Sequence, residues 1–230
     1  PLAQFTYQPD AQGKQQLRPG AAKLLMLKQN GTTWQSHVLE DPHSRVFHKA
    51  LCTKGVHSSP ALQVLTIAAS RAALTAWPGP ASAGERLWDP NFGGRWDRLR
   101  DIERGYVQSK QQQHWVVGSH DQGVIAVLDI SQNPPRVTEI ARQAGTFIHE
   151  IELADVDGDG LDEIFATPSA PNRANHSQGG AVVMYRYNAA TRSYRKHTVA
   201  QFKQRHAKEI LAAHFSRKHP VEIYVALEAE

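Results

Sequence analysis

The sequence predicts an all-β fold assembled from a four-stranded unit that recurs about every fifty residues. Two observations lead to this prediction. Short runs of β-branched and aromatic residues recur between turn residues, which is typical of strands, and no long stretch has the 3.6-residue periodicity of a helix. Four of these runs resemble one another, at 62–67, 115–118, 163–167 and 222–226, and their starts lie 53, 48 and 59 residues apart.

Three further strand types accompany these runs, which form the second strand of each unit. The first strand has a basic residue followed two positions later by an apolar one, at 48–51, 100–103, 149–152 and 208–211. The third strands are expected at 22–26, 72–76, 124–128 and 181–185, and the fourth at 33–37, 86–88, 136–140 and 195–199. Asn30-Gly31 joins the earliest third and fourth strands, and this dipeptide is a strong hairpin signal. The chain is therefore expected to begin with a third and a fourth strand, to continue with three complete sets of four strands, and to end with a first and a second strand.

Four antiparallel strands per repeat are typical of a β-propeller. We therefore expect a single β-propeller domain over residues 1–230 with about four blades, namely 42–92, 95–143, 146–202 and a closing blade made from 21–41 and 206–230. In that blade, strand 22–28 would lie beside strand 221–227, so that no sheet edge is left unpaired. Two alternatives stay open: the chain is a slice of a larger ring, or two chains form one larger ring as a homo-oligomer.

The composition excludes several classes of protein. The formal net charge is only +4 over 230 residues and the basic residues are scattered, so we expect a solvated basic surface and no nucleic-acid binding. No apolar run approaches the roughly 18–20 residues that span a bilayer. Cys52 is the only cysteine, which excludes an internal disulfide.

An acidic, glycine-bearing loop lies between a first and a second strand at 155–163. Its carboxylates recur at alternate positions, and Ca²⁺ prefers six to eight oxygen ligands gathered around one point. The residues expected to bind the ion are Asp155, Asp157, Asp159, Leu161 through its carbonyl, and Glu163. So many acids repel one another unless a cation neutralises them, and we therefore predict Ca²⁺ as a cofactor rather than a plain acidic turn. A calcium loop in turn favours an extracellular or periplasmic location.

Residues 148–167, which read Ile-His-Glu-Ile-Glu-Leu-Ala-Asp-Val-Asp-Gly-Asp-Gly-Leu-Asp-Glu-Ile-Phe-Ala-Thr, resemble the FG-GAP/VCBS repeats of β-propellers related to the integrin α-subunit head. The resemblance covers one repeat and implies a propeller with a calcium site there. The corresponding loops at 53–59, 107–110 and 215–219 lack the acids. The family includes adhesion modules, lectin-like modules and carbohydrate lyases or dehydratases, so the resemblance implies fold and metal rather than one activity.

The starts of the first strands carry the candidate binding chemistry. In a propeller the innermost strands converge on a central channel, and their starts lie on the face opposite the acidic loop. The candidate catalytic residues are His48, Arg100, His149, Glu150 and His206, and the candidate ligand-binding residues are His120, Asp121, Asn172, Arg173, His176 and Lys208.

Three interpretations of this set stay open. The cations with His and Glu suit an anionic or polyhydroxylated ligand, and His48, His149 and His206 with Glu150 suit a transition metal. In the third interpretation, the polar residues pair with one another in channel water. The leading functional prediction is a calcium-stabilised binding module for a carbohydrate or a protein. The alternative is a carbohydrate lyase or dehydratase that uses the His, Arg and Glu side chains.

Overall fold

The chain folds entirely into antiparallel β-sheets and their connections. The computed structural model describes residues 5–79, 82–94, 97–171, 178–213 and 220–228. Within these ranges the one helical element is a single 3₁₀ turn, Val56–Ser58, and no helix has the length and apolar character that a membrane crossing requires. The prediction of an all-β chain built from four-stranded antiparallel sheets is confirmed.

Three complete sheets follow one another along the chain, and in each the four strands pair in sequence order. The first contains β5 (Val46–Thr53), β6 (Gln63–Ala69), β7 (Ala73–Trp77) and β8 (Glu85–Trp88). The second contains β9 (Leu99–Gly105), β10 (His114–Ser119), β11 (Ile125–Asp129) and β12 (Arg136–Ala141). The third contains β13 (Phe147–Ala154), β14 (Glu163–Ser169), β15 (Gly180–Asn188) and β16 (Ser193–Phe202). These sheets fall within the ranges 42–92, 95–143 and 146–202 expected from the sequence.

The two ends of the chain form separate two-stranded sheets. These are β3 (Ala22–Asn30) with β4 (Thr33–Asp41), and β17 (Ala207–Ala213) with β18 (Glu222–Leu227). An additional hairpin that the sequence analysis missed, β1 (Phe5–Pro9) with β2 (Gln15–Pro19), precedes them.

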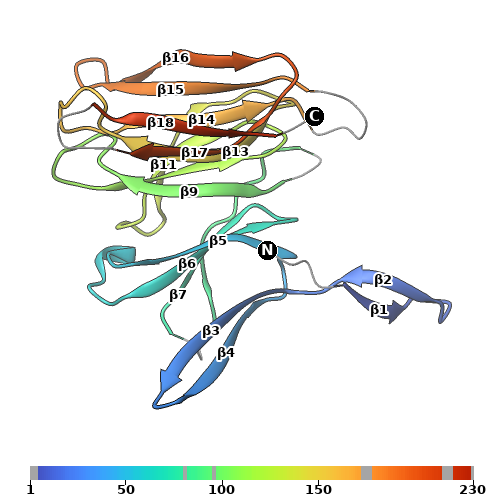
Figure 1. The fold of residues 1–230 in the computed structure, drawn as a ribbon. Coiled ribbons are helices and arrows are strands. Elements are labelled where there is room, and N and C mark those ends of the chain that lie inside the picture. The colour runs from blue at the N-terminus through green and yellow to red at the C-terminus, as the bar shows by residue number, and fades with distance from the viewer. Residues whose placement is uncertain (1–4, 80–81, 95–96, 172–177, 214–219, 229–230) are drawn as a thin grey trace.

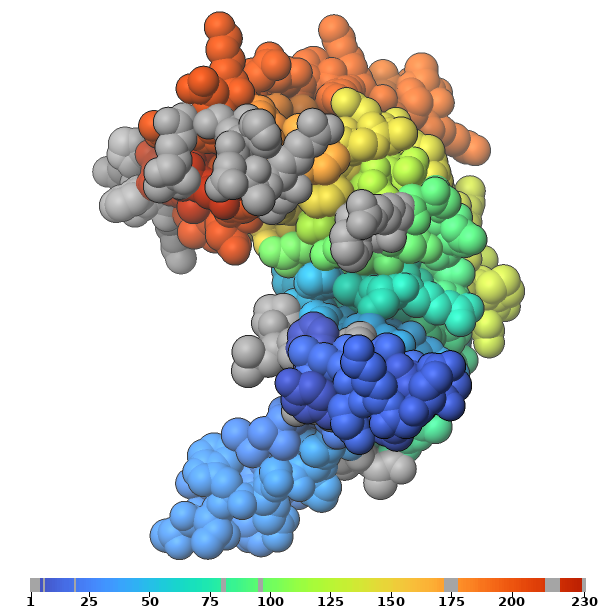
Figure 2. Space-filling model, turned by 90° about the vertical axis from the view of Figure 1, so that its right-hand side faces the viewer, coloured from blue at the N-terminus to red at the C-terminus, as the bar shows by residue number. Residues whose placement is uncertain are grey.

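The expected closing blade is not formed in this structure. Among the described strands, β3 pairs only with β4 and β18 only with β17, so the prediction that strand 22–28 lies beside strand 221–227 is not met. The sheets instead follow an open arc, with the two terminal hairpins apart (Figure 2). The physical reason is that a sequence repeat sets the order of strands, whereas side-chain packing sets the angle between successive sheets.

The hydrophobic core lies between successive sheets. All five residues of β7 and all six of β10 are buried, whereas the outer strand β12 has no buried residue. Leu65 and Leu74 of the first sheet share one cluster with Ile102 and Trp115 of the second, and a similar cluster joins the second sheet to the third. Middle strands covered on both faces therefore read as apolar runs, as the sequence shows.

The first strands β5, β9, β13 and β17 occupy one edge of their sheets and lie next to one another in that order (Figure 1). Neighbouring first strands run in the same direction. In β5 and β9, for example, Lys49 contacts Asp101 and, further along both strands, Thr53 contacts Arg104. This arrangement brings the starts of four strands, far apart in the sequence, into one row.

Candidate functional site

All four first strands carry a β-bulge near their start, at the same point of the register. In β5 the pairing with β6 passes from Phe47 to Lys49 and leaves His48 as an extra residue. The corresponding extra residues are Arg100 in β9, Lys208 in β17 and one of the pair His149 and Glu150 in β13. A bulge bends its strand and re-aims the extra side chain. Residues of different chemistry therefore occupy one structural position in each sheet.

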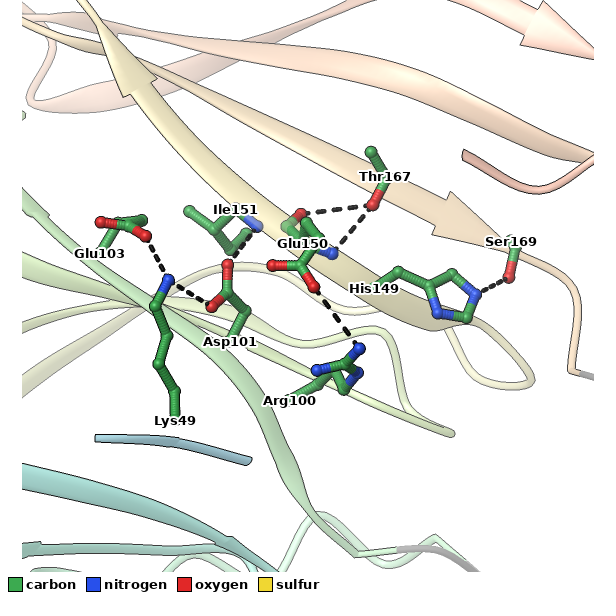
Figure 3. A network of polar contacts seen from close by, with 9 residues as sticks. All are labelled: Lys49, Arg100, Asp101, Glu103, His149, Glu150, Ile151, Thr167 and Ser169. Atoms are coloured by element: carbon green, nitrogen blue, oxygen red, sulfur yellow. Dashed lines mark hydrogen bonds and ion pairs between the residues drawn. The ribbon is translucent and has the colours of Figure 1, made fainter. Parts of the chain in front are cut away.

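Charged side chains connect these first strands across the junctions between sheets (Figure 3). Lys49 of β5 donates to Asp101 of β9 at 2.8 Å, and also to Glu103. Asp101 also accepts the backbone N–H of Ile151 in β13 at 2.7 Å. One buried carboxylate therefore ties three successive sheets together.

The Lys49 ammonium is held in its charged form by this network. Burial alone lowers its pKa, but Asp101 and then Glu103 outweigh burial and raise the pKa above its ordinary value. The buried Asp101 carboxylate thus has a cation and a backbone donor as partners, which is the condition under which a buried charge is stable.

Glu150 lies beside this network and retains its proton at neutral pH. Burial, the neighbouring Asp101 charge and a hydrogen bond with Asp101 raise its pKa to about 9, although Arg100 opposes the rise. The 3.4 Å contact between Arg100 Nη2 and Glu150 Oε1 is the geometry of an ion pair. We interpret it as a hydrogen bond to a neutral carboxyl, because Asp101 already supplies the negative charge at this point. Glu150 is therefore a proton donor placed between an acid and a cation.

His149, the next residue, is buried and has a defined tautomer. Its Nε2 lies 2.8 Å from the Ser169 hydroxyl, which donates its own hydrogen to the Ala170 carbonyl at 3.0 Å. The serine oxygen therefore accepts a hydrogen from Nε2. In the neutral ring this leaves Nδ1 as an acceptor.

Three imidazole rings from three successive sheets lie in contact. The His120 and His149 ring centroids are 5.4 Å apart, and those of His149 and His206 are 5.5 Å apart. His120 also stacks on the Phe147 ring at 4.4 Å. His48 is the extra residue of the β5 bulge, in the sheet that precedes that of His120. We call His48, His120, His149 and His206 the histidine row.

The histidine row is uncharged at neutral pH. Burial, reinforced by Arg100 and other neighbouring cations, lowers the pKa of His48 to about 3. Burial and nearby arginines lower the pKa of His120 to about 2, and burial and Lys208 lower that of His149 to about 3. The row is therefore a run of neutral imidazoles bordered by cations.

Several ring nitrogens in the row are buried without a hydrogen-bond partner among the described residues. They are Nε2 of His48, both nitrogens of His120 and Nε2 of His206. His206 Nδ1 lies 3.2 Å from Lys208 Nζ. Since an ammonium can only donate, Nδ1 accepts and Nε2 carries the hydrogen. Glu228, 3.4 Å from the same Nδ1, has its cationic partner in Lys208 at 3.1 Å. Burial lowers the pKa of His206, which favours a neutral ring.

A cavity of about 620 Å³ opens in the third sheet, and none of the four histidines of the row lines it. Ser169, which binds His149, is one of its lining residues, together with Thr146, Gly180, Gln201 and Lys203. This volume is within the range of small-molecule sites.

The structure thus places most of the predicted candidates in one region and leaves others aside. His48, Arg100, His120, His149, Glu150, His206 and Lys208 lie along the first strands or beside them. Asp121 lies at the turn after β10 with a positive φ of 70°, against Gly94. Asn172, Arg173 and His176 are outside the described residues. The roles of Asp101 and Ser169 were missed; the register hinted at Asp101, but nothing in the sequence pointed to Ser169.

The acidic loop lies at the other end of β13. One carboxylate oxygen each from Asp155, Asp157 and Asp159 lies within 4.8 Å of the others. The loop is held in shape by its own backbone, since Asp155 accepts N–H groups of Gly158 at 2.8 Å and Gly160 at 2.9 Å. The three carboxylates therefore converge as the spacing predicts.

Two other residues of the predicted calcium set are arranged differently. Glu163 is buried, and its carboxylate accepts from Arg186 Nε at 2.9 Å and from the Val156 N–H at 3.0 Å. Arg186 also contacts Asp157 at 3.3 Å. The Leu161 N–H donates to Asp159 at 2.7 Å. Glu163 is thus joined to the acidic loop through Arg186 rather than pointing at the three aspartates.

No family model matches this chain, and no curated protein matches it.

Proposed function

We propose that this chain contributes blades to a β-propeller binding module whose histidine row binds a polyhydroxylated small molecule such as a carbohydrate. The observation that carries the proposal is the set of buried imidazole nitrogens without partners. Buried polar groups nearly always have a hydrogen-bond partner, and each one left without costs about 1–3 kcal/mol. Three histidines with such nitrogens, His48, His120 and His206, lie at or beside the starts of the first strands. This grouping favours a binding role, because a ligand would supply the missing partners.

The hydrogen-bonding pattern favours hydroxyl groups as the ligand's contacts. The row offers an acceptor at His149 Nδ1 and a donor at His206 Nε2. A hydroxyl both donates and accepts, so it satisfies either kind of group. Arg100 and Lys208 beside the row would add affinity for a carboxylate on the same ligand.

A test is calorimetric titration with a panel of neutral monosaccharides, uronic acids and short oligosaccharides. His149→Ala and His206→Ala should each weaken the binding of any hit by about 3- to 10-fold, the equivalent of one hydrogen bond. His114→Ala is the matched control, since His114 is also buried with an unpartnered Nδ1 but starts β10 at the end away from His120. Equal loss in all three variants, or no hit in the panel, would contradict the proposal.

A carbohydrate lyase or dehydratase is the second candidate, and the protonated Glu150 favours it. A carboxylic acid with a pKa near 9 is a competent general acid at neutral pH. The companion base is weak, because a general base works best with a pKa near the working pH and that of His149 is about 3. Binding is therefore the better supported function. Release of an unsaturated sugar product, abolished by Glu150→Gln, would reverse this order.

We also propose Ca²⁺ as the ion that the acidic loop binds, which accords with the resemblance of residues 148–167 to FG-GAP/VCBS repeats. The support is the convergence of Asp155, Asp157 and Asp159. Carboxylate oxygens are the ligands that Ca²⁺ prefers, and the Leu161 carbonyl and water would complete the set.

Thermal unfolding with CaCl₂, MgCl₂ or EGTA tests the calcium proposal. Calcium at 100 times its Kd stabilises the folded chain by about 2.7 kcal/mol, and Asp157→Asn should remove that gain. Glu139→Gln, on β12, should keep it. The same melting temperature in calcium and in EGTA would exclude the site.

A further inference from the structure

The two terminal hairpins are complementary halves of one sheet. In each complete sheet the second strand pairs with the third, as β14 does with β15. Among the described strands, β18 is a second strand that pairs with no third strand, and β3 is a third strand that pairs with no second strand. Each therefore has a sheet edge that no described strand pairs, and such edges favour addition of another strand.

The pairing of β14 with β15 predicts how these two edges would match. In that sheet Glu163 ion-pairs with Arg186, and Phe165 lies opposite Met184. β18 repeats the Glu-Ile-aromatic start of β14, with Glu222 and Tyr224, and β3 repeats β15, with Met26 and Lys28 in place of Met184 and Arg186. The similarity extends to the next strand of each sheet, because His197 of β16 lies opposite Met184 and His37 of β4 lies opposite Met26. The register therefore sets Tyr224 opposite Met26 and Glu222 opposite Lys28, an oppositely charged pair.

Apolar side chains on these hairpins are exposed at positions that the complete sheet buries. Leu25 and Leu27 are each 56% exposed, whereas Val183 and Tyr185, at the same positions of β15, are 3% and 5% exposed. Tyr224 is 42% exposed, whereas its counterpart Phe165 is 2% exposed. Each hairpin therefore lacks a neighbour that would cover its apolar side chains, and exposed apolar surface favours an interaction site.

The geometry of the arc decides what covers these surfaces. β3 and β18 lie at opposite ends of the open arc (Figure 2), so they do not pair within this chain. We propose that a second copy of this chain pairs head to tail with the first, so that β18 of each copy adds to β3 of the other. Each copy holds three complete sheets and two halves, so two copies form eight sheets. Eight is within the range of known propellers, and head-to-tail contacts that close produce a ring.

The mass of the protein in solution is the first test. Light scattering after size exclusion should give about 51 kDa, twice the 25.5 kDa of one chain. A mass of 25.5 kDa at all concentrations up to about 100 µM would overturn the proposal. The histidine row lies within one chain, so this result is independent of the proposed ligand.

A charge-reversal cycle tests the register. Glu222→Lys should raise the dimer dissociation constant at least tenfold, because it sets two lysines opposite each other at both junctions. Glu222→Lys combined with Lys28→Glu should restore the parent value, and Glu139→Lys, on the exposed β12, should leave it unchanged. Far-UV circular dichroism checks that each variant is folded. A double variant as weak as Glu222→Lys would refute the strand pairing.

Discussion

Replacing Asp101 by alanine should destabilise the chain more than any surface ion-pair substitution. The Asp101 side chain is 2% exposed and accepts from Lys49 Nζ at 2.8 Å and from the Ile151 N–H at 2.7 Å. Removing one partner of a buried ion pair costs about 3–5 kcal/mol, but Lys49 is partly exposed and keeps Glu103, which reduces this term. The orphaned Ile151 N–H adds about 1–3 kcal/mol. We expect a total loss of about 3 kcal/mol.

Urea unfolding measures this loss as a lower midpoint with an unchanged slope. At about 2–4 °C per kcal/mol for a chain of this size, the melting temperature should fall by about 6–12 °C. Asp101→Asn keeps an acceptor for Ile151 and should lose about half as much. The control is Glu139→Ala: its ion pair with Arg142 is short, at 2.6 Å, but Glu139 is 39% exposed, so the loss should stay below about 0.5 kcal/mol. Equal losses for Asp101→Ala and Glu139→Ala would refute the view that burial makes Asp101 the central tie.

Three further predictions concern pH and packing. Glu150 keeps its proton in the folded chain up to about pH 9 but loses it near pH 4.5 when unfolded, so its contribution to stability falls as pH rises between these values, by up to about 1.4 kcal/mol per pH unit. Glu150→Gln should therefore gain stability relative to the parent between pH 5.5 and 8.5 in urea melts, and a constant difference would contradict this. The histidines with folded pKa values of about 2–3 are His48, His120 and His149. Above pH 6.5 these rings are neutral in both the folded and the unfolded chain, and as pH falls toward 3 the unfolded chain gains protons that the folded chain does not, so stability decreases. Replacing His120 by phenylalanine removes one such group and should move the acid-unfolding midpoint to lower pH. An unchanged midpoint would argue against a buried neutral ring. A Cβ at Gly118 would lie 2.7 Å from the Ile148 side chain, so Gly118→Ala should cost about 1–3 kcal/mol in the same assay, and an unchanged midpoint would show that the junction yields.

The strand order could be predicted from the sequence because middle strands are buried on both faces. In a middle strand the side chains on both faces are buried, as in Ile164, Phe165 and Ala166 of β14, so the strand reads as an apolar run. Such runs stand out from the polar outer strands. The missed hairpin of β1 and β2 had a weaker pattern, with Phe5, Tyr7 and Leu17 all exposed. Its turn was readable in retrospect, since the Asp10 side chain accepts the N–H groups of Gln12 and Lys14.

The path of the arc could not be predicted from the sequence. Closure depends on the angle at each junction, and that angle depends on packing between residues far apart in sequence. Val116, Ile151 and Val183, for example, belong to one core cluster. The repeat shows only that half-sheets exist at both ends. Whether the two half-sheets meet depends on the sum of the angles between successive sheets. No short sequence motif encodes that sum.

The candidate site was accessible to sequence reasoning only in part. The shared register of the first strands predicted equivalent positions for His48, Arg100, His149 and Lys208. The structure has a bulge at each of these points, with His149 or Glu150 as the extra residue in β13. The consequences of burial were not accessible, because the pKa of Glu150 depends on Asp101 from the neighbouring sheet. Side chains that act across a junction are adjacent only in three dimensions.

The bulge in each first strand frees one residue from the strand pairing that constrains ordinary positions of a sheet. An ordinary strand position must satisfy a ladder partner and two packed faces, so its side chain is constrained. The extra residue of a bulge has no opposite partner, and here that position holds a histidine, an arginine or a lysine in otherwise similar sheets. The side chain at these positions therefore varies between sheets while the pairing of the strands stays the same. A library of variants at the four positions would change the chemistry of one region of the surface without changing the order of the strands.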